Sequence, residues 1–463
     1  MTERRLKPYP GYKDSGVEWL GEVPEHWEVR RLDATVGTCQ NGVWGDEPDG
    51  LHDVVCVRVA DFDRVTFSVD LENQTLRSVE PASLGAHLLR PGDLLLEKSG
   101  GGENQPVGAV VLFDHAVPAV CSNFVARMTV PSGFVARYLT YMHAALYALR
   151  INTRHIKQST GIQNLNASSY LGEAVGLPSE PEQRAIAAFL DRETARIDAL
   201  VAKKERLIDL LQEQRTALIT RAVTKGLDPN APMKDTGIEW LGEIPAHWEV
   251  KRLGFLLDGR PKNGVSPAIG VNGTTPTFST TAVADGVVGI EGQIKYTAVS
   301  SHEAKLFLLL RGDVLMLRGS GSRALVGRAG IVIDEPPEGC IYPDILIRLR
   351  HIVSVTAWYL VACLNSTAVR PAIELAAKTA AGIWKITSED VQNLAMPLPP
   401  RQEQVEIESY VTEGAARIDA LVAKVRDAMD RLKELRTALI SAAVTGKIDV
   451  RDEAGLVGGT SVV

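Results

Sequence analysis

Two short polar segments, 157–164 and 378–385, contain the side chains with which proteins hold phosphates and read bases. Their sequences are KQSTGIQN and KTAAGIWK. Lysine, serine and threonine side chains and glycine amides bind phosphate oxygens, while glutamine, asparagine and arginine can form paired hydrogen bonds with base edges in the major groove of DNA. The chemistry that these residues indicate is non-covalent recognition of a nucleic acid.

Each polar segment lies in a basic stretch of a chain whose formal net charge is −7. Residues 115–172 contain five arginines or lysines and no acidic residue, and residues 345–388 contain five against one glutamate. A single charged run is usually a solvated surface, but its recurrence at the same place favours a DNA-binding face. The candidate DNA-binding residues are Lys98, Arg154, Lys157, Gln158, Ser159, Thr160, Gln163, Asn164, Arg318, Arg323, Lys378, Thr379 and Lys385.

Motifs for catalysis are missing from the sequence. There is no P-loop, no HExxH, no GxSxG and no Asn/Asp-Pro-Pro-aromatic tetrapeptide of amino-methyltransferases. Asp93 and Glu97 precede Lys98 somewhat as in metal-dependent nucleases, but Glu97 and Lys98 are adjacent where one residue should separate them. We expect a non-catalytic chain; a self-contained nuclease or methyltransferase and a helical scaffold without a DNA role are the alternatives.

The cysteines encode neither a disulfide framework nor a metal site. They are five in number, scattered, and contain no CxxC pair, so we expect reduced thiols and no bound metal. No uninterrupted apolar run approaches the ~18 residues that span a bilayer, and the polar N-terminus is no signal peptide. The expected location is cytoplasmic.

The polar segments recur because the chain contains an internal repeat of 221 residues. Residues 196–203, RIDALVAK, reappear unchanged at 417–424. Around them, apolar residues spaced alternately by three and four predict two long helices, and two near-identical seams favour an antiparallel coiled coil. Ordinary core helices are the alternative. The predicted helix–helix seam consists of Ile197, Leu200, Leu207, Leu211, Leu218, Ile418, Leu421, Leu432, Leu435 and Leu439.

A second repeated element, which we call the lead segment, precedes each helix. Residues 13–32 match residues 234–253 at 15 of 20 positions. Each lead segment has two tryptophans around a proline, a pattern that favours anchoring of an irregular segment onto its domain, with direct ligand binding as the alternative. The tryptophans are Trp19, Trp27, Trp240 and Trp248.

Between lead segment and helix lie two stretches, 33–177 and 254–398, that are similar in length but mostly different in sequence. Short apolar runs bounded by turn residues predict strands in both, for example at 94–96 and 314–317, and apolar helical stretches follow. The predicted fold class is mixed α/β, with two related domains separated by two long helices that form an antiparallel coiled coil. Two domains that share a fold but differ in their surface residues are predicted to recognise two different targets.

The repeated pattern resembles the specificity (S) subunit of type I restriction-modification enzymes over essentially the whole chain. The residues that carry the resemblance include the two WLGE(V/I)PxHWEV motifs, which begin at Trp19 and Trp240. They also include a Leu-Pro followed by Glu-Gln at 177–183 and again at 398–404, and the ending AVTGKID at 443–449.

The resemblance implies two pseudo-twofold-related target recognition domains, each reading one half of a bipartite asymmetric DNA site. It also implies that the helical spacer docks two methyltransferase (M) subunits and that restriction (R) translocase-nuclease subunits join this core. S-adenosylmethionine, ATP and Mg would be used by those partners, with no cofactor in this chain. The expected boundaries are 1–178 for the first recognition domain with its lead segment, 179–226 for the first helix, 227–398 for the second domain, 399–447 for the second helix and 448–463 for a C-terminal tail.

Overall fold

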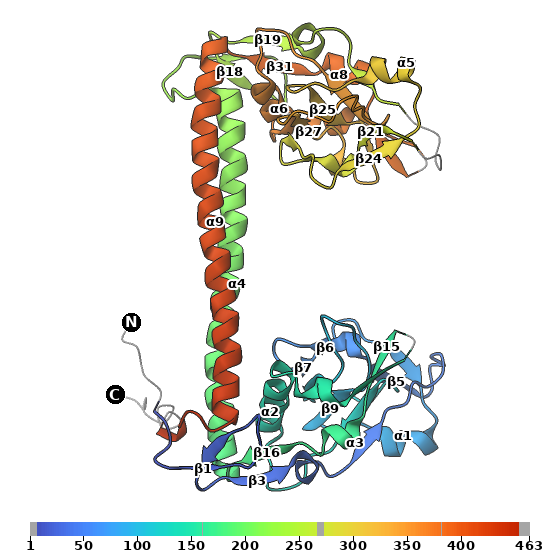
Figure 1. Ribbon diagram of the computed structural model, residues 1–463, viewed down its shortest axis with the longest axis vertical. Helices are drawn as coiled ribbons and strands as arrows, with labels where there is room; N and C mark the ends of the chain where they lie inside the picture. The colour runs from blue at the N-terminus through green and yellow to red at the C-terminus, as the bar shows by residue number, and fades with distance from the viewer. Residues whose placement is uncertain (1–6, 160, 266–272, 381, 453–463) are drawn as a thin grey trace. The chain divides into compact units, whose positions relative to one another are not determined.

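The chain divides into two compact units. The computed structural model describes residues 7–159, 161–265, 273–380 and 382–452. Unit 1 comprises residues 1–204 and 427–463, and unit 2 comprises residues 205–426. Each unit is a mixed α/β body that includes part of both long helices, α4 (Glu180–Lys225) and α9 (Arg401–Val444) (Figure 1). No helix within the described ranges is long and apolar enough to cross a lipid bilayer.

Unit 1 is organised around the buried strand β9 (Asp93–Glu97). Leu94 and Leu96 point into the core that contains α2 (Ala136–Ala148), while Leu95 points into a second core on the other face. The six-stranded sheet runs β4 (Cys39–Asn41), β13 (Val125–Met128), β9, β11 (Val110–Phe113), β7 (Ser68–Val69) and β6 (Phe62–Asp63). Further sheets are β12 (Ala119–Cys121), β5 (Asp53–Val57) and β8 (Leu76–Ser78); β10 (Ser99–Gly100), β15 (Ile162–Leu165) and β14 (Ile156–Ser159); β1 (Tyr12–Asp14) and β2 (Glu22–Pro24); and β3 (Glu28–Arg31) and β16 (Ala174–Leu177), with short helices α1 (Pro81–His87) and α3 (Ala167–Tyr170).

Unit 2 repeats this plan around β25 (Val314–Leu317). Val314 and Met316 face the core that contains α6 (Ala357–Asn365), and Leu315 faces the opposite core. The predicted mixed α/β fold class is confirmed. The sheet runs β20 (Lys262–Asn263), β28 (Leu346–Leu349), β25, β27 (Ala329–Ile331), β23 (Val287–Val288) and β22 (Val283–Ala284). The other elements are β21 (Thr275–Phe278) with β24 (Ile294–Thr297); β26 (Gly319–Ser320), β30 (Ile383–Lys385) and β29 (Lys378–Ala380); β17 (Met233–Asp235) with β18 (Glu243–Pro245); β19 (Glu249–Arg252) with β31 (Ala395–Leu398); and α5 (Ser301–Ala304), α7 (Arg370–Ala376) and α8 (Ser388–Asn393).

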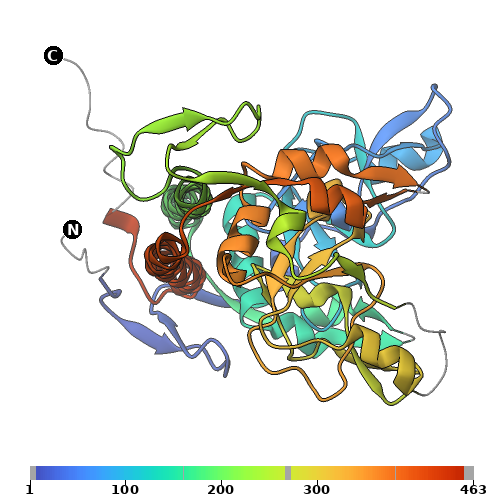
Figure 2. The same ribbon diagram turned by 90° about the horizontal axis from the view of Figure 1, so that it is seen from above.

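Within each unit the segments of α4 and α9 lie side by side (Figure 2). In unit 1, Arg436 Nε donates to Asp198 Oδ1 at 2.9 Å, and in unit 2, Arg215 Nε lies 3.2 Å from Asp419 Oδ1. Arg436 and Asp419 are the repeat counterparts of Arg215 and Asp198. The same ion pair therefore forms once in each unit with the helices exchanged, as expected for an isologous pair of helices.

The buried side of the helices differs from the predicted seam at four leucines. Leu200, Leu207, Leu421 and Leu435 are exposed by 40, 42, 49 and 54%. In three cases the next residue, Val201, Ile208 or Val422, takes the more buried position, and in the fourth Arg436 does. Neighbouring apolar residues give two heptad phases of similar apolarity, so periodicity could not choose between them. Ile197 and Ile418 are buried, and Leu211, Leu218, Leu432 and Leu439 are half-buried.

Each lead segment is anchored by a tryptophan to the beginning of one long helix. In unit 1 the buried Trp27 donates its indole N–H to Glu182 Oε1 of α4 at 3.1 Å. In unit 2 the buried Trp248 donates to Glu403 Oε2 of α9 at 3.0 Å. The tryptophans thus act as anchors, and the glutamate that follows the Leu-Pro motif is their acceptor.

The end of the other helix packs on the same tryptophan. Gly226 follows α4 and lies against Trp248, while Gly446 lies two residues beyond α9 against Trp27, and both adopt positive φ (71° and 74°) as helix-terminating glycines do. The neighbouring Lys225 and Lys447 donate to backbone carbonyls of β18 and β2, respectively. The sequence order Lys-Gly in one copy and Gly-Lys in the other therefore produces the same two contacts.

One buried histidine distinguishes the core of unit 1. His143 of α2 has no exposed surface, its Nδ1 lies 2.8 Å from the Tyr170 hydroxyl, and its Nε2 has no hydrogen-bond partner. Burial lowers the pKa of His143 to about 4. Unit 2 has the buried Leu364 at the corresponding position.

We expect His143 to make unit 1 sensitive to acid. Between pH 6.5 and about 4 the unfolded chain binds a proton on this side chain that the folded chain does not, so stability falls as the pH falls through that window. The loss attributable to His143 is about 2 kcal/mol between pH 6.5 and 5. Urea denaturation at pH 7.5 and 5.0 should show a smaller pH dependence for His143→Leu than for the unchanged chain; equal dependences would contradict this assignment.

Candidate nucleic-acid interface

In unit 1 most of the predicted DNA-binding residues gather on one small sheet. Strands β14 and β15 form a hairpin in which Lys157 lies opposite Asn164, and β10 adds Ser99 on the other side of Asn164. Ser99 Oγ donates to Asn164 Oδ1 at 2.6 Å. Lys98 adjoins this row because its carbonyl accepts from the amide of Leu165 at 2.8 Å. The fold therefore brings together candidates separated by more than fifty residues.

Unit 2 builds the corresponding sheet from β26, β30 and β29. Lys378 lies directly opposite Lys385, and both side chains are exposed. Like charges at opposed positions destabilise a pair of strands unless an anion lies between them. Arg318 adjoins this sheet through a backbone hydrogen bond from Ile386 at 2.9 Å. The hairpin presents two cations where a phosphate group would be stabilised.

Arginine and tryptophan support the hairpin of unit 2 from the side. The guanidinium of Arg323 lies 5.0 Å from the ring centroid of Trp384, and its Nε and Nη2 donate to the carbonyl of Glu374 at 2.9 and 2.6 Å. Thr379 is exposed and lies opposite Trp384. Arg323 is therefore partly committed to holding the hairpin in place.

Gln163 does not lie on the exposed face. Its side chain is 8% exposed, and its Oε1 accepts from the amide of Val107 at 3.3 Å. Successive residues of a strand point to opposite faces, so the exposed Ile162 and Asn164 place Gln163 inward. The Gln163 side chain thus stabilises the sheet, and a contact of this residue with DNA stays a prediction.

The remaining candidates differ in accessibility. Gln158 is exposed on β14, and Arg154 is exposed on the 3-10 turn Ile151–His155 that precedes it. The Arg318 side chain is 28% exposed and lies 3.9 Å from the Asp344 carboxylate. Ser159 ends β14, and Thr160 lies outside the described residues.

Tertiary contacts neutralise most of the arginines in the two basic stretches. Arg127 and Arg137 pair with Asp93 and Asp191 at 2.7 and 2.6 Å. In unit 2, Arg350 and Arg370 likewise pair with Asp313 and Glu374, at 2.7 and 3.5 Å. Within the described parts of the chain, no carboxylate forms an ion pair with Lys157, Lys378 or Lys385. The positive charge that stays available includes the hairpin lysines and, in unit 1, the exposed Arg150 and Arg154 that precede the hairpin.

Asn41 and Phe124 also belong to this surface, although no sequence motif marks them. Lys98 Nζ donates to Asn41 Oδ1 of β4. Phe124 is 47% exposed, and its carbonyl accepts from the amides of Lys98 and Ser99 at 2.8 and 3.2 Å. Asn41 lies on β4, and Phe124 lies in the turn between β12 and β13. The exposed ring of Phe124 beside the half-buried Lys98 favours a base contact here, since aromatic rings contact bases by stacking or by apolar contact.

The carboxylates that could suggest a nuclease are buried and paired. Asp93 accepts from Arg127, and Glu97 accepts from Arg64 Nη2 at 2.8 Å. Burial raises the pKa of Glu97, and the charge of Arg64 opposes that shift. Among the residues described, no group of three or more histidine, cysteine, aspartate and glutamate side chains is arranged to hold a metal ion. Asp93 and Glu97 therefore serve the core of unit 1.

Comparison with known proteins identifies relatives that match most of the chain. No family model matches the chain. It is 24% identical over 439 residues to the type I restriction enzyme EcoKI specificity subunit of Escherichia coli, covering 92% of this chain and 90% of that protein. The StySPI specificity subunit of Salmonella potsdam is also 24% identical, over 443 residues and the same shares. The chain is a homologue of type I specificity subunits. A putative specificity subunit, MjaX of Methanocaldococcus jannaschii, is 22% identical over 442 residues, covering 93% of this chain and 96% of the relative.

Solved structures agree with this homology at the level of the fold. A structure of a type I restriction-modification system superimposes with a TM-score of 0.68 at 19% identity, covering 92% of this specificity-subunit homologue and 99% of the other chain. The crystal structure of the HsdS subunit from Thermoanaerobacter tengcongensis gives a TM-score of 0.51 at 18% identity, with 92% and 98% coverage. The relatives are named as specificity subunits of type I restriction enzymes.

Proposed function

We propose that this chain selects the DNA sequence for a type I restriction-modification complex by reading the two halves of a bipartite site, one with each unit. The observation that carries the proposal is the recurrence of an exposed hairpin with unpaired lysines at the same position of both scaffolds. The β14–β15 hairpin offers Gln158 and Asn164, whereas the β29–β30 hairpin offers Thr379 and Lys385. Because the presented side chains differ, the half-sites should differ, and the site should be asymmetric.

The long helices are proposed to dock two methyltransferase subunits. Leu200 in unit 1 and Leu421 in unit 2 occupy equivalent repeat positions, and both side chains are exposed. An exposed leucine that recurs at the equivalent position of both helices supports one docking position in each unit. Restriction subunits would join this core, and S-adenosylmethionine, ATP and Mg would be bound by the partner subunits. This chain would direct methylation and restriction without catalysing either.

Removing the two opposed lysines of unit 2 tests the DNA-binding proposal. In the complex reconstituted with its methyltransferase subunits, Lys378→Ala combined with Lys385→Ala should weaken binding to every duplex. Each lost phosphate contact lowers the slope of log affinity against log salt by about 0.9, which for two contacts corresponds to roughly 30-fold weaker binding near 0.15 M salt. Fluorescence anisotropy over a salt series measures both quantities.

The matched control removes two lysines outside the hairpins. Lys203 and Lys424 are exposed, occupy equivalent repeat positions on α4 and α9, and carry the same total charge. Their replacement by alanine should leave the salt slope unchanged. If both double variants bind alike, or if the complex binds duplex DNA without salt dependence, the scaffold alternative is favoured over DNA recognition.

A further inference from the structure

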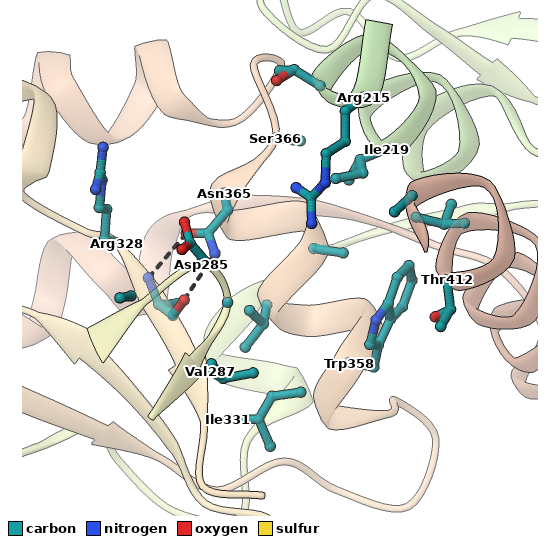
Figure 3. Close-up of a pocket in the computed structure, with 18 of the residues that line it drawn as sticks. Arg215, Ile219, Asp285, Val287, Arg328, Ile331, Trp358, Asn365, Ser366 and Thr412 are labelled. Carbon is teal, nitrogen blue, oxygen red and sulfur yellow. Dashed lines mark hydrogen bonds between the residues drawn. The ribbon is translucent and has the colours of Figure 1, made fainter. Parts of the chain in front are cut away.

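Unit 2 contains a cavity of about 700 Å³ between its segments of α4 and α9, helix α6 and the β22–β23 turn (Figure 3). Arg215 and Thr412 line it from the long helices, Trp358 from α6, and Val287 and Ile331 from the sheet. At its rim Val287 is 37% exposed. The cavity is thus an open recess with an apolar part, formed by Trp358, Val287 and Ile331, and a polar part that includes the guanidinium of Arg215 and Asp285.

Unit 1 fills the corresponding place with its own side chains. Phe67, from the turn between β6 and β7, lies with its ring centroid 5.1 Å from the guanidinium of Arg436, the repeat counterpart of Arg215. Tyr141 of α2 packs edge-on against Phe67 at 6.0 Å and donates its hydroxyl to Asp191 at 2.7 Å. Arg137 packs on Tyr141 and bonds the same carboxylate. This aromatic cluster joins the turn to the helix pair.

The backbone that carries Phe67 is retained in unit 2, but its side chain is absent. The carbonyl of Phe67 accepts from the amide of Leu112 at 2.9 Å, and the carbonyl of Gly286 accepts from that of Ile331 at 3.0 Å. Both Phe67 and Gly286 have positive φ, 56° and 82°. Phenylalanine rarely adopts this conformation, so the contacts of Phe67 must hold it there. Glycine at the same place leaves the recess empty.

Arg137 corresponds to Trp358, which lines the cavity, but further members of the cluster are replaced by residues that fill less of the recess or cannot make the same bonds. At the repeat distance of 221 residues, Tyr141 corresponds to Ala362, and Asp191 corresponds to Thr412. Thr194, which lies 3.3 Å from the Tyr141 hydroxyl, corresponds to Ala415. The cavity in unit 2 therefore lies where unit 1 has the side chains of its aromatic cluster.

The arginine inside the cavity is incompletely satisfied. Arg215 lies beside Asp419, but its buried Nε has no hydrogen bond of good geometry. In the described residues no aromatic ring packs on its guanidinium, in contrast to Arg436. An aromatic ring entering the recess would cover apolar surface and provide the cation–π contact that Arg215 lacks.

We propose that this cavity is a socket for an aromatic side chain, phenylalanine or tyrosine, presented on a turn of another polypeptide. Unit 1 supplies the template for the occupant, because there the recess is occupied by a turn that carries phenylalanine. A volume of about 700 Å³ exceeds one ring and accommodates part of the turn as well. The socket gives unit 2 a protein-binding site that unit 1 lacks, and it does not depend on how the hairpins bind DNA.

A photoreactive peptide tests the socket directly. The probe is the turn of unit 1, residues 62–69 (FDRVTFSV), with benzoylphenylalanine in place of Phe67, and the same peptide with alanine there serves as an unlabelled competitor control. On the full chain, we expect labelling of the segment that contains Trp358, located by mass spectrometry. The unlabelled native-sequence peptide should compete at least tenfold better than the alanine peptide.

Variants in which a larger side chain fills the cavity serve as matched controls for the labelling experiment. Ala362→Phe restores bulk at the position of Tyr141, and Ala415→Leu fills the cavity from α9 should the first variant fold poorly; each should reduce labelling at least tenfold. Phe67→Ala opens the recess of unit 1 and should create a second labelled segment there. DNA binding by the assembled complex should change less than twofold in the filled variants. Labelling that is equal in the open and filled chains, or a small molecule or second copy of this chain found in the cavity, would overturn the proposal.

Discussion

Replacing Trp248 with alanine is expected to lower the free energy of unfolding of unit 2 by about 3–5 kcal/mol, the range for removing a fully buried large aromatic side chain. Trp248 has no exposed surface, donates to Glu403, and contacts Gly226 at the end of α4. Its loss would leave a cavity among three chain segments and a carboxylate without its indole donor. Urea denaturation of the full chain, followed by circular dichroism, measures the effect.

The counterpart and the control make this experiment specific. Trp27→Ala should cause a loss of similar size in unit 1, where the tryptophan donates to Glu182. Because the units can unfold in separate transitions, each variant should shift one transition more than the other. Trp44 is 37% exposed and packs on Arg77, so Trp44→Ala should cost no more than about 1 kcal/mol. Comparable losses for Trp44 and Trp248 would refute the anchoring role.

Placing glutamate at Leu200 or at Leu421 is expected to remove one methyltransferase subunit from the complex. Each leucine is exposed in its unit and sits beside a more buried valine, so glutamate should be tolerated by the fold but would bring a charge into a docked apolar surface. The expected loss of affinity is about 100-fold or more per site, equivalent to ~2.7 kcal/mol. Native mass spectrometry should find one methyltransferase copy with either variant and none with both.

Neighbouring alanines provide the control for docking. Ala202 and Ala423 are exposed and occupy equivalent repeat positions, about 200° around the helix from the leucines. Glutamate at these positions should leave two methyltransferase copies bound. Retention of both copies in the Leu200→Glu, Leu421→Glu double variant would show that the partners dock elsewhere.

The sequence alone determined the repeat, the two long helices, the mixed α/β class and the region that carries the candidate interface. These follow from local information. The run Leu94-Leu95-Leu96, bounded by turn residues, predicted a strand that proved to be buried on both faces, and RIDALVAK repeated at 221 residues predicted equivalent helices. Even the tryptophan anchors were predictable, because two large aromatics around a proline in an irregular segment must pack against something.

Only the tertiary structure decided which side chains of each helix and strand are exposed and free to bind a partner. Periodicity could not choose Val201 over Leu200, because both are apolar and the direction of the partner helix sets the phase. Strand alternation turned Gln163 inward, and Lys98 met Asn41 through strand pairing that no local motif encodes. Whether the recess beside Arg436 or Arg215 is full depends on Phe67 or Gly286, residues far from those arginines in the chain. Local sequence specifies elements and their apolar faces, but contacts between distant segments determine which side chains remain free to bind a partner.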